Sequence, residues 1–357
     1  MKDIYLITDN ARTAGSAINR QMSFAEKWRL VSAAGLTSLT IPESHEGPDL
    51  NAAQISQVLS AFAEHCPDAR FAFALGAHLL AGLYPLRFIL SEPLKKHVYN
   101  AVLHNGYVLA NAITESTSGN NVFAMQTSAV SENDHYILSG SKTFCTNAQF
   151  ADGIVVYALT NPTKGMMGGV SCFLAERSKN HFITGGEAET VFGNVYFNES
   201  HLPAENLIGK AGSGTKLFLD SMNLERACLA ALHCGTMKRI IKQTVQHVKQ
   251  RHNGTQLLSE YQAVQFRIAE METQLEASRL ISAKAAIAFD TKTNEDLYCA
   301  MAKVTTSEAL DHVCRNALIL YGASGLENLM PDVTAAQESQ LYSGSNDVLR
   351  NLIASRL

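Results

Sequence analysis

One carboxylate interrupts an otherwise apolar stripe in the second half of this 357-residue chain. Phe218 and Met222 precede Glu225 by seven and three residues, and Leu229 and Leu232 follow it by four and seven. These spacings place side chains on one face of an α-helix, so we expect Glu225 to lie out of water. Burial raises the pKa of a carboxyl group, as a general base working near neutral pH requires. The pattern favours Glu225 as a base over the alternative, a solvated glutamate on a helix edge.

A second cluster has the composition of a ligand-binding loop. Residues 114–121 read TESTSGNN. Such residues offer short hydroxyl groups and free backbone N–H groups to a ligand that approaches closely. The same composition is typical of an ordinary hairpin loop, so the segment alone leaves both interpretations open.

Composition excludes several other kinds of chemistry. The formal net charge of -4 argues against the basic footprint of a nucleic-acid-binding protein. The seven cysteines are dispersed without a CxxC pair, which argues against a disulfide framework or a structural zinc site, and we expect no metal site. No P-loop or HExxH motif occurs, and the scattered histidines are expected to be structural or solvated. The first ten residues do not resemble a secretory signal, and no apolar stretch is expected to reach transmembrane length.

The elements that must position these residues fall into three blocks. Residues 1–105 read as a helical domain, with apolar residues at helical spacing in Gln54–Phe62 and Leu80–Leu90. Residues 106–210 change to short β-prone runs separated by Gly, Asn and Ser clusters. The runs are Tyr107–Ile113, Tyr136–Leu138, Gly153–Tyr157, Val170–Leu174 and Val195–Phe197.

Residues 211–357 return to helix, with three long segments that contain no proline. These segments are Lys216–Arg251, Tyr261–Thr291 and Glu295–Tyr321. Their lengths suit a bundle of antiparallel helices. We therefore expect an α+β multidomain fold with a helical N-terminal domain, a central antiparallel β-domain and a C-terminal four-helix bundle.

Motifs spread in order over nearly the whole chain resemble those of the acyl-CoA dehydrogenase superfamily. Residues 114–121 resemble T-E-P-G-A-G-S-D, and residues 136–148 resemble y-x-L-n-G-x-K-x-W-I-T-N-a. Residues 222–230 resemble the L-D-L-E-R-x-x-L-A motif in which isovaleryl-CoA dehydrogenases carry their catalytic glutamate. Residues 341–350 resemble i-Y-E-G-T-x-x-x-x-R. One such motif is weak evidence, whereas several in the correct order are strong.

The resemblance implies an FAD enzyme that desaturates an acyl thioester between Cα and Cβ. A base takes the α-proton, which Glu225 would do here, and the β-hydrogen leaves as hydride to flavin N5. The substrate would be an acyl-CoA or an acyl group on a carrier protein, because both use the pantetheine arm. An electron-transfer flavoprotein or another acceptor would reoxidise the flavin. Family members place FAD between the β-domain and the bundle of one subunit and complete its site from a second, so a homodimer or homotetramer is implied.

The resemblance also implies a set of cofactor contacts. Phe144 and Thr146 correspond to a Trp and a Thr against the flavin ring, and Arg251 corresponds to an Arg that reaches the flavin pyrophosphate of a neighbouring subunit. The full set is Thr114, Gly119, Asn120, Phe144, Thr146, Arg251, Gln262, Gly322, Gly344, Ser345 and Asp347.

Several of these positions depart from the family pattern. Asn120 and Asn121 replace Ser-Asp, and Gly254 and Thr255 replace the Phe-Gly that follows the family's arginine. A solvated arginine remains the alternative for Arg251. For Gly322, in a degraded G-G-x-G motif, a helix C-cap remains the alternative.

Ser343 stands where many family members carry the catalytic glutamate. A serine cannot take a proton from carbon without a base of its own, but its backbone N–H can still polarise the thioester carbonyl. The resemblance thus assigns the base to Glu225 and a supporting catalytic role to Ser343. It implies that Asn223 and Arg226 hold the pantetheine arm, although a structural salt bridge remains open for Arg226.

Two rival functions share this fold. A flavin-dependent monooxygenase also lacks the glutamate at position 343, but it needs no α-base, so Glu225 counts against it. A non-catalytic flavin-binding or acyl-binding relative is supported somewhat by the departures from the motifs. For all three functions, we expect a cytoplasmic protein that binds neither nucleic acid nor membrane.

Overall fold

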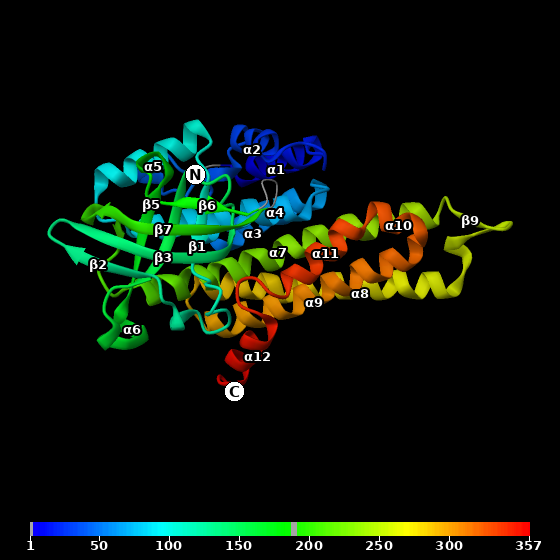
Figure 1. Cartoon of the computed structure of the whole chain (residues 1–357). Coiled ribbons are helices and arrows are strands. Elements are labelled where there is room, and N and C mark those ends of the chain that lie inside the picture. Colours follow the sequence, from blue (N-terminus) through cyan, green and yellow to red (C-terminus); the bar gives the residue numbers. More distant parts are fainter. Residues whose placement is uncertain (1–2, 187–190) are drawn as a thin grey trace.

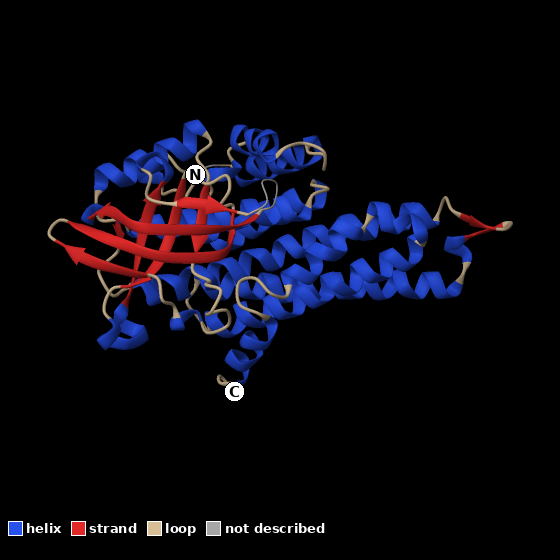
Figure 2. Cartoon of the chain, in the orientation of Figure 1, coloured by secondary structure: helices blue, strands red, loops and turns tan. Residues whose placement is uncertain are grey.

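A central β-sheet lies between a layer of N-terminal helices and a long C-terminal helix bundle (Figures 1 and 2). The computed structural model describes residues 3–186 and 191–357. The expected α+β architecture is confirmed. The expected domain limits stay a prediction, although α5 ends at Asn105 and β8 ends at Ile208, close to both limits.

The N-terminal helices begin at residues that satisfy their free N–H groups. Ser23 and Glu26 form a capping box at the start of α2, and Asn51 and Gln54 form another at α3. The helices of this part are α1 (Ile4–Ala17), α2 (Phe24–Ala33), α3 (Ala52–His65), α4 (Ala69–Ala77) and α5 (Glu92–Asn105).

The helix that begins with α4 continues as a π-helical stretch, His78–Leu83, and a 3-10 turn, Tyr84–Phe88. Among the described residues, the segment Ala69–Phe88 is long and apolar enough for a membrane-spanning helix, contrary to our expectation that no stretch reaches that length. However, 83% of its most apolar window is buried inside the structure, so it is a core helix. Buried His78 ties this segment to the sheet, because its Nδ1 accepts the backbone N–H of Leu109.

The sheet orders its strands β6-β7-β3-β2-β4-β5-β8, and β1 pairs with β4. Every expected β-prone run lies in or overlaps a strand. The strands are β1 (Leu109–Ala112), β2 (Ser128–Glu132), β3 (His135–Thr146), β4 (Gly153–Leu159), β5 (Val170–Glu176), β6 (Ile183–Gly185), β7 (Phe192–Pro203) and β8 (Leu207–Ile208). A short helix, α6 (Gly165–Gly169), connects β4 to β5.

The expectation of a purely antiparallel sheet was wrong. β1 runs parallel to β4, with Leu109 opposite Gly153, and β2 meets β4 in parallel at Ser128. A parallel pair needs a long crossover rather than a hairpin. Here β2 and β3 lie in sequence between β1 and β4, and they supply that crossover.

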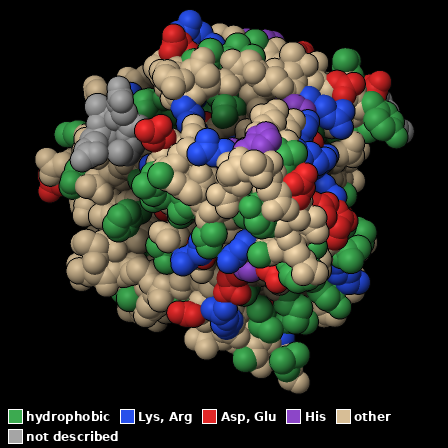
Figure 3. Space-filling model, turned by 90° about the vertical axis from the view of Figure 1, so that its right-hand side faces the viewer, with side chains coloured by type: hydrophobic (Ala, Val, Ile, Leu, Met, Phe, Trp, Pro, Cys, Tyr) green, Lys and Arg blue, Asp and Glu red, His purple; other side chains and the backbone are tan. Residues whose placement is uncertain are grey.

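Three long antiparallel helices form the bundle, as expected, and the shorter α10 and α11 lie along α9 in the fourth position (Figure 1). The bundle elements are α7 (Gly214–Val248), α8 (Gln262–Asp290), α9 (Glu295–Tyr321), α10 (Ala323–Asn328), α11 (Met330–Ser339) and α12 (Asn346–Ala354). A small hairpin of β9 (His252–Asn253) and β10 (Gln256–Leu257) projects from the far end. On the face at that end, acidic, basic and hydrophobic side chains are interspersed (Figure 3).

One hydrophobic core joins all three parts of the chain. Phe62 of α3, Tyr157 of β4 and Leu229 of α7 are all fully buried in it. All seven cysteines are buried and unpaired. Since α7 contacts both the N-terminal helices and the sheet, it is the element from which a site between them can be built.

A buried ion pair fixes the loop that follows β1. Lys142 Nζ donates to Glu115 Oε1 at 2.9 Å and to the carbonyl oxygen of Ile113, and the side chain of Lys142 is fully buried. The Glu115 carboxylate also accepts the backbone N–H groups of Gln126 and Thr127. One carboxylate therefore closes both ends of the 115–127 loop over the sheet.

Lys142→Met should lower the free energy of unfolding by about 3 kcal/mol, because it leaves the Glu115 carboxylate buried without its cation. Chemical denaturation of the purified protein measures the loss. Lys238→Met is the matched control, since Lys238 is 45% exposed and pairs with Glu64 at the surface. A surface ion pair of this kind contributes about 1 kcal/mol or less to the free energy of unfolding. Equal losses in the two variants would contradict a structural role for the buried pair.

Candidate active site

Glu225 lies in the middle of α7 and is buried as its apolar stripe predicted. Its exposed fraction is 4%, and Phe218, Met222, Leu229 and Leu232 are buried with it. Burial raises the pKa of Glu225 to about 7, although a hydrogen bond from Ser343 and the charge of Arg226 act in the opposite direction. Carboxylate atom Oε2 is buried and has no hydrogen-bond partner among the described residues. Glu225 Oε2 is therefore a buried oxygen that can accept a proton near neutral pH.

Ser343 is brought directly to this carboxylate from the other end of the C-terminal region. Its Oγ donates to Glu225 Oε1 at 2.6 Å. The backbone of Ser343 has a φ of 57°, and Gly344 follows with a φ of 89°. A left-handed conformation is uncommon for a residue with a side chain, so the surrounding contacts must hold this turn.

Arg226 holds the turn from α7, and Asn223 in turn holds Arg226. Arg226 Nε donates to the carbonyl oxygen of Ser343 at 2.9 Å, and its Nη1 donates to Asn223 Oδ1 at 3.1 Å. Both side chains are buried. The structure thus gathers four of the predicted residues, Asn223, Glu225, Arg226 and Ser343, around one turn.

Lys303 of α9 was missed by the sequence reasoning. Its Nζ donates to the carbonyl oxygen of Gly344 at 3.0 Å and to Asn346 Oδ1 at 2.8 Å. Burial lowers the pKa of Lys303 to about 7. The signal that revealed Glu225 could have found it, since Lys303 is one charged residue among buried Cys299, Ala300, Thr306 and Leu310 at helical spacings.

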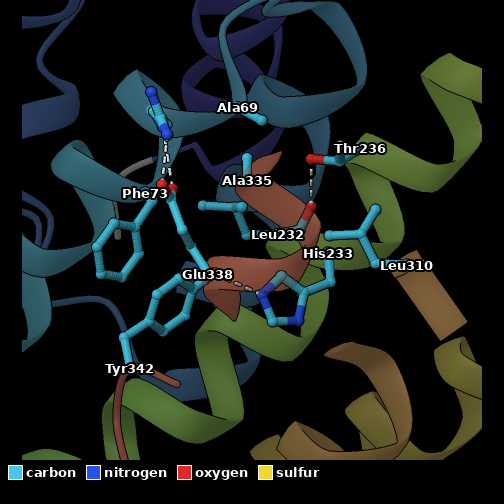
Figure 4. A pocket seen from close by; sticks show the side chains of 10 residues that line it. Ala69, Phe73, Leu232, His233, Thr236, Leu310, Ala335, Glu338 and Tyr342 are labelled. Atoms are coloured by element: carbon cyan, nitrogen blue, oxygen red, sulfur yellow. Dashed lines mark hydrogen bonds and ion pairs between the residues drawn. The ribbon is translucent and has the colours of Figure 1, made fainter. Parts of the chain in front are cut away.

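Behind the turn, Tyr342 is fixed by two aromatic partners (Figure 4). Its ring stacks on Phe73 with centroids 3.9 Å apart, and its hydroxyl lies 2.9 Å from His233 Nε2. His233 Nδ1 lies 3.0 Å from Thr306 Oγ1, and burial lowers the pKa of His233 to about 3, so this histidine is neutral and structural. A cavity of about 10 Å³ remains beside these rings, room for roughly one water molecule.

Phe144 offers a flat aromatic face at the edge of the sheet. Between Lys142 and Cys145 the pairing of β3 with β7 shifts register, and Phe144 takes a φ of 54° in this bulge. The ring is 75% exposed. A bulge that turns a large aromatic side chain outward is typical of a ligand-binding surface. Thr146 follows two residues later, half-buried on the same strand.

The loop after β1 connects this aromatic face to the turn at Ser343. Thr143 N–H donates to the carbonyl oxygen of Thr114 at 2.8 Å, beside Phe144. Farther along the loop, Ser345 Oγ donates to Asn120 Oδ1 at 3.2 Å. The predicted flavin contacts Thr114, Asn120, Phe144, Gly344 and Ser345 therefore share one region with Glu225. These residues fit a flavin, because they combine an exposed aromatic face with hydroxyl and amide groups.

Three of the predicted cofactor residues lie elsewhere. Arg251, Gln262 and Gly322 are exposed at the far end of the bundle, roughly 35 Å along α7 from Glu225. Gly322 ends α9 with a φ of 61°, as the helix-cap alternative predicted. Gly119 has open space around its Cα, and Asp347 is exposed and pairs with Arg350.

Comparison with known proteins agrees with this geometry. Residues 110–206 match the model of the acyl-CoA dehydrogenase middle domain, and residues 212–357 match that of the acyl-CoA dehydrogenase C-terminal domain. The chain is 31% identical over 346 residues to the L-prolyl-[peptidyl-carrier protein] dehydrogenase of Pseudomonas fluorescens. The aligned residues cover 93% of this chain and 90% of the relative. It is 30% identical to the cyclohex-1-ene-1-carbonyl-CoA dehydrogenase of Geobacter metallireducens over 335 residues, 90% of this chain and 86% of that protein.

Solved structures give the same result for the fold. The FAD complex of PigA superimposes with a TM-score of 0.92 and 28% identity, over 100% of this chain and 97% of the other. The butyryl-CoA dehydrogenase of Megasphaera elsdenii, at 23% identity, superimposes with a TM-score of 0.90 over 99% and 96% of the two chains. On the family models, the relatives and the fold together, this chain belongs to the acyl-CoA dehydrogenase family.

Proposed function

We propose that Glu225 is the base that removes the α-proton of an acyl thioester. The chain is an FAD-dependent oxidoreductase that dehydrogenates acyl thioesters, as its family and relatives indicate. The observation that carries the assignment of the base is the buried Glu225 carboxylate. One of its oxygens is held by Ser343, and the other has no partner in the part of the chain that the structure describes. When bound, FAD supplies the acceptor for the β-hydrogen.

The residues around Glu225 orient the base, polarise the thioester and hold the flavin. The hydrogen bond from Ser343 orients the carboxylate, so that Oε2 is the atom that receives the proton. The backbone N–H of Ser343 can polarise the thioester carbonyl, a role that depends on the turn rather than on the side chain. Arg226 and Lys303 hold the carbonyl oxygens of Ser343 and Gly344, and so they keep that N–H in place. Phe144 and Thr146 hold the flavin ring, and the loop from Thr114 to Asn120 lies beside it.

The substrate class follows from the relatives and from the arm that their substrates share. One relative acts on a prolyl group on a peptidyl carrier protein and another on a cyclic acyl-CoA. An acyl group joined through pantetheine would pass Asn223 and Arg226 on its way to Glu225. The enzyme would act in the cytoplasm and pass its electrons to an electron-transfer flavoprotein or another acceptor.

A second copy of the chain would complete the cofactor site. Arg251, Gln262 and Gly322 lie too far along the bundle to reach a flavin held at Phe144 of the same chain. All three are exposed, and the guanidinium of Arg251 suits a pyrophosphate. We therefore infer a homodimer, alone or within a homotetramer, in which Arg251 serves the FAD of its partner.

Glu225→Gln should keep the bound FAD but slow its reduction by substrate by about 10³-fold, because the amide cannot take the α-proton. The measurement is anaerobic bleaching of the flavin band on addition of acyl-CoA and acyl-carrier-protein thioesters. Glu276→Gln is the matched control, an exposed glutamate of α8 paired with Arg279.

A Glu225→Gln enzyme that bleaches at the wild-type rate would remove Glu225 from the mechanism. If the wild-type enzyme, with FAD firmly bound, bleaches with none of the thioesters, the dehydrogenase function fails. The next addition is then a flavin reductase and oxygen, which tests a monooxygenase.

The rate of flavin reduction should rise with pH through about 7, because only the deprotonated form of Glu225 accepts a proton. Ser343→Ala removes a hydrogen bond that favours the carboxylate, so the pKa of Glu225 should increase and the midpoint should move upward by about one pH unit. The pH profile of single-turnover bleaching measures both midpoints. Ser278→Ala, which removes a buried hydroxyl from α8, should leave the profile unchanged. An unmoved or lowered midpoint in Ser343→Ala would show that Ser343 does not tune the base.

Arg251→Ala should weaken FAD retention without moving the pH midpoint, because Arg251 contacts the pyrophosphate from the partner subunit and not the base. Flavin content after gel filtration measures the retention. Arg279→Ala is the control, because Arg279 is a partly exposed arginine on the neighbouring helix α8. Full retention in Arg251→Ala would refute the shared cofactor site.

A further inference from the structure

A stripe on α7 leads away from Glu225 toward the start of the helix. Thr215, Leu219, Met222 and Arg226 recur at helical spacing and share one face. From Thr215 to Arg226 the helix rises roughly 16 Å. An extended phosphopantetheine arm is on the order of 17 Å long at standard bond lengths, so an arm that starts at Arg226 and follows this stripe ends near Thr215.

At that end of the stripe the short helix α6 packs against the first turn of α7. Thr215 Oγ1 donates to the carbonyl oxygen of Met166 at 2.6 Å, and the backbone N–H of Gly212 donates to Ser171 Oγ at 2.9 Å. Figure 1 shows α6 projecting from the molecule at the end of the sheet, on the side opposite α5. The mouth of the proposed path is therefore built from α6 and the segment before α7.

The side chains at this mouth are apolar and basic. Met166 is 45% exposed, Met167 is 66% exposed and Leu219 on the stripe is 41% exposed. Lys164, Lys210 and Lys216 are exposed beside them, and none of the three forms an ion pair with another described residue. Residues 161–175 and 206–219 together contain these three lysines and no aspartate or glutamate.

Exposed methionines surrounded by lysines suit contact with a protein better than contact with a nucleotide. Exposed apolar side chains scattered singly are ordinary, but here two adjacent methionines form the tip of a projecting helix. Methionine is adaptable and is common on surfaces that bind other proteins. Free lysines around an apolar centre form the basic rim that an acidic partner would complement.

We infer that Met166 and Met167, with Lys164, Lys210 and Lys216, form a docking surface for the acidic face of a carrier-protein domain. The domain would present its acyl group on a phosphopantetheine arm that follows the α7 stripe to Glu225. This inference rests on the proposed function, and it selects a carrier protein over coenzyme A. The five residues are called the Met-Lys surface below.

The test compares one acyl group on three carriers. The L-prolyl group is loaded on a peptidyl carrier protein, on coenzyme A and on pantetheine, and the kcat/KM for flavin reduction is measured for each. The triple variant Lys164→Glu, Lys210→Glu and Lys216→Glu should lose about tenfold in kcat/KM with the carrier protein, because charge reversal slows electrostatically steered association. Its kcat/KM with prolyl-pantetheine should change by less than about twofold, because pantetheine does not touch the Met-Lys surface.

Lys96→Glu is the matched control, an exposed lysine of α5 on the other side of the sheet. It should leave all three values unchanged. A second measurement needs no variant: with the wild-type enzyme, rising salt should lower kcat/KM for the carrier protein and leave that for pantetheine nearly constant.

The outcomes separate the inference from the function on which it rests. Equal kcat/KM values for the triple variant and the wild type with the carrier protein would overturn the docking surface while the dehydrogenase activity stands. A loss of the same size with prolyl-coenzyme A would also overturn it, because the lysines would then hold nucleotide phosphates. If prolyl thioesters do not reduce the wild-type flavin, the same three carriers are compared with whichever acyl group does reduce it. If no acyl group does, the proposed function fails and the docking surface fails with it.

Discussion

The hydrogen bond between Ser343 and Glu225 is the interaction on which the site depends. It joins a helix in the middle of the chain to a turn near its end, and it links two groups that could not act separately. A buried carboxylate without a donor would stay protonated up to a higher pH, and a serine without the carboxylate would have no base. In the proposed mechanism, the two residues share the task that the family resemblance assigns to a single glutamate at this turn. The left-handed backbone of the turn directs Ser343 Oγ at the Glu225 carboxylate, and in the proposed mechanism it directs the Ser343 N–H toward the substrate.

The rest of the structure keeps this pair in place. α7 is held from one side by α3 and from the other by α8 and α9, so Glu225 has no freedom to move to solvent. The turn is held by basic side chains on two different helices, Arg226 on α7 and Lys303 on α9. The buried pair of Lys142 and Glu115 fixes the loop on the sheet side. Each support is a buried charged group with partners, and such groups specify one arrangement because their alternatives leave charges unpaired.

The sequence predicted the parts that rest on local periodicity. The three long helices begin and end within a few residues of their expected limits, and the apolar stripe around Glu225 was visible from spacing alone. The parallel pairing of β1 with β4 was not predicted, because register between distant strands leaves no local pattern. The contact of Ser343 with Glu225 spans more than a hundred residues and could not be derived without the fold. Lys303 could have been found, because it stands on its helix as Glu225 does, but no motif drew attention to it.

In the proposed mechanism, the charges around Glu225 explain why a carboxylate at position 225 can take the role that the family resemblance assigns to position 343. Arg226 and Lys303 face the same turn, and both stabilise the ionised form of Glu225. In the proposed reaction, Glu225 loses its negative charge when it takes the α-proton, while negative charge develops on the thioester carbonyl beside the Ser343 N–H. The negative charge thus moves only from the Glu225 carboxylate to the nearby thioester carbonyl. Both positions lie beside Arg226 and Lys303, so no group has to reorganise during the step. A carboxylate on either side of the turn meets the same requirement, provided that the turn, Arg226 and Lys303 stay in place. In the proposed mechanism, the base can therefore stand on the helix or on the turn while the electrostatic arrangement is kept.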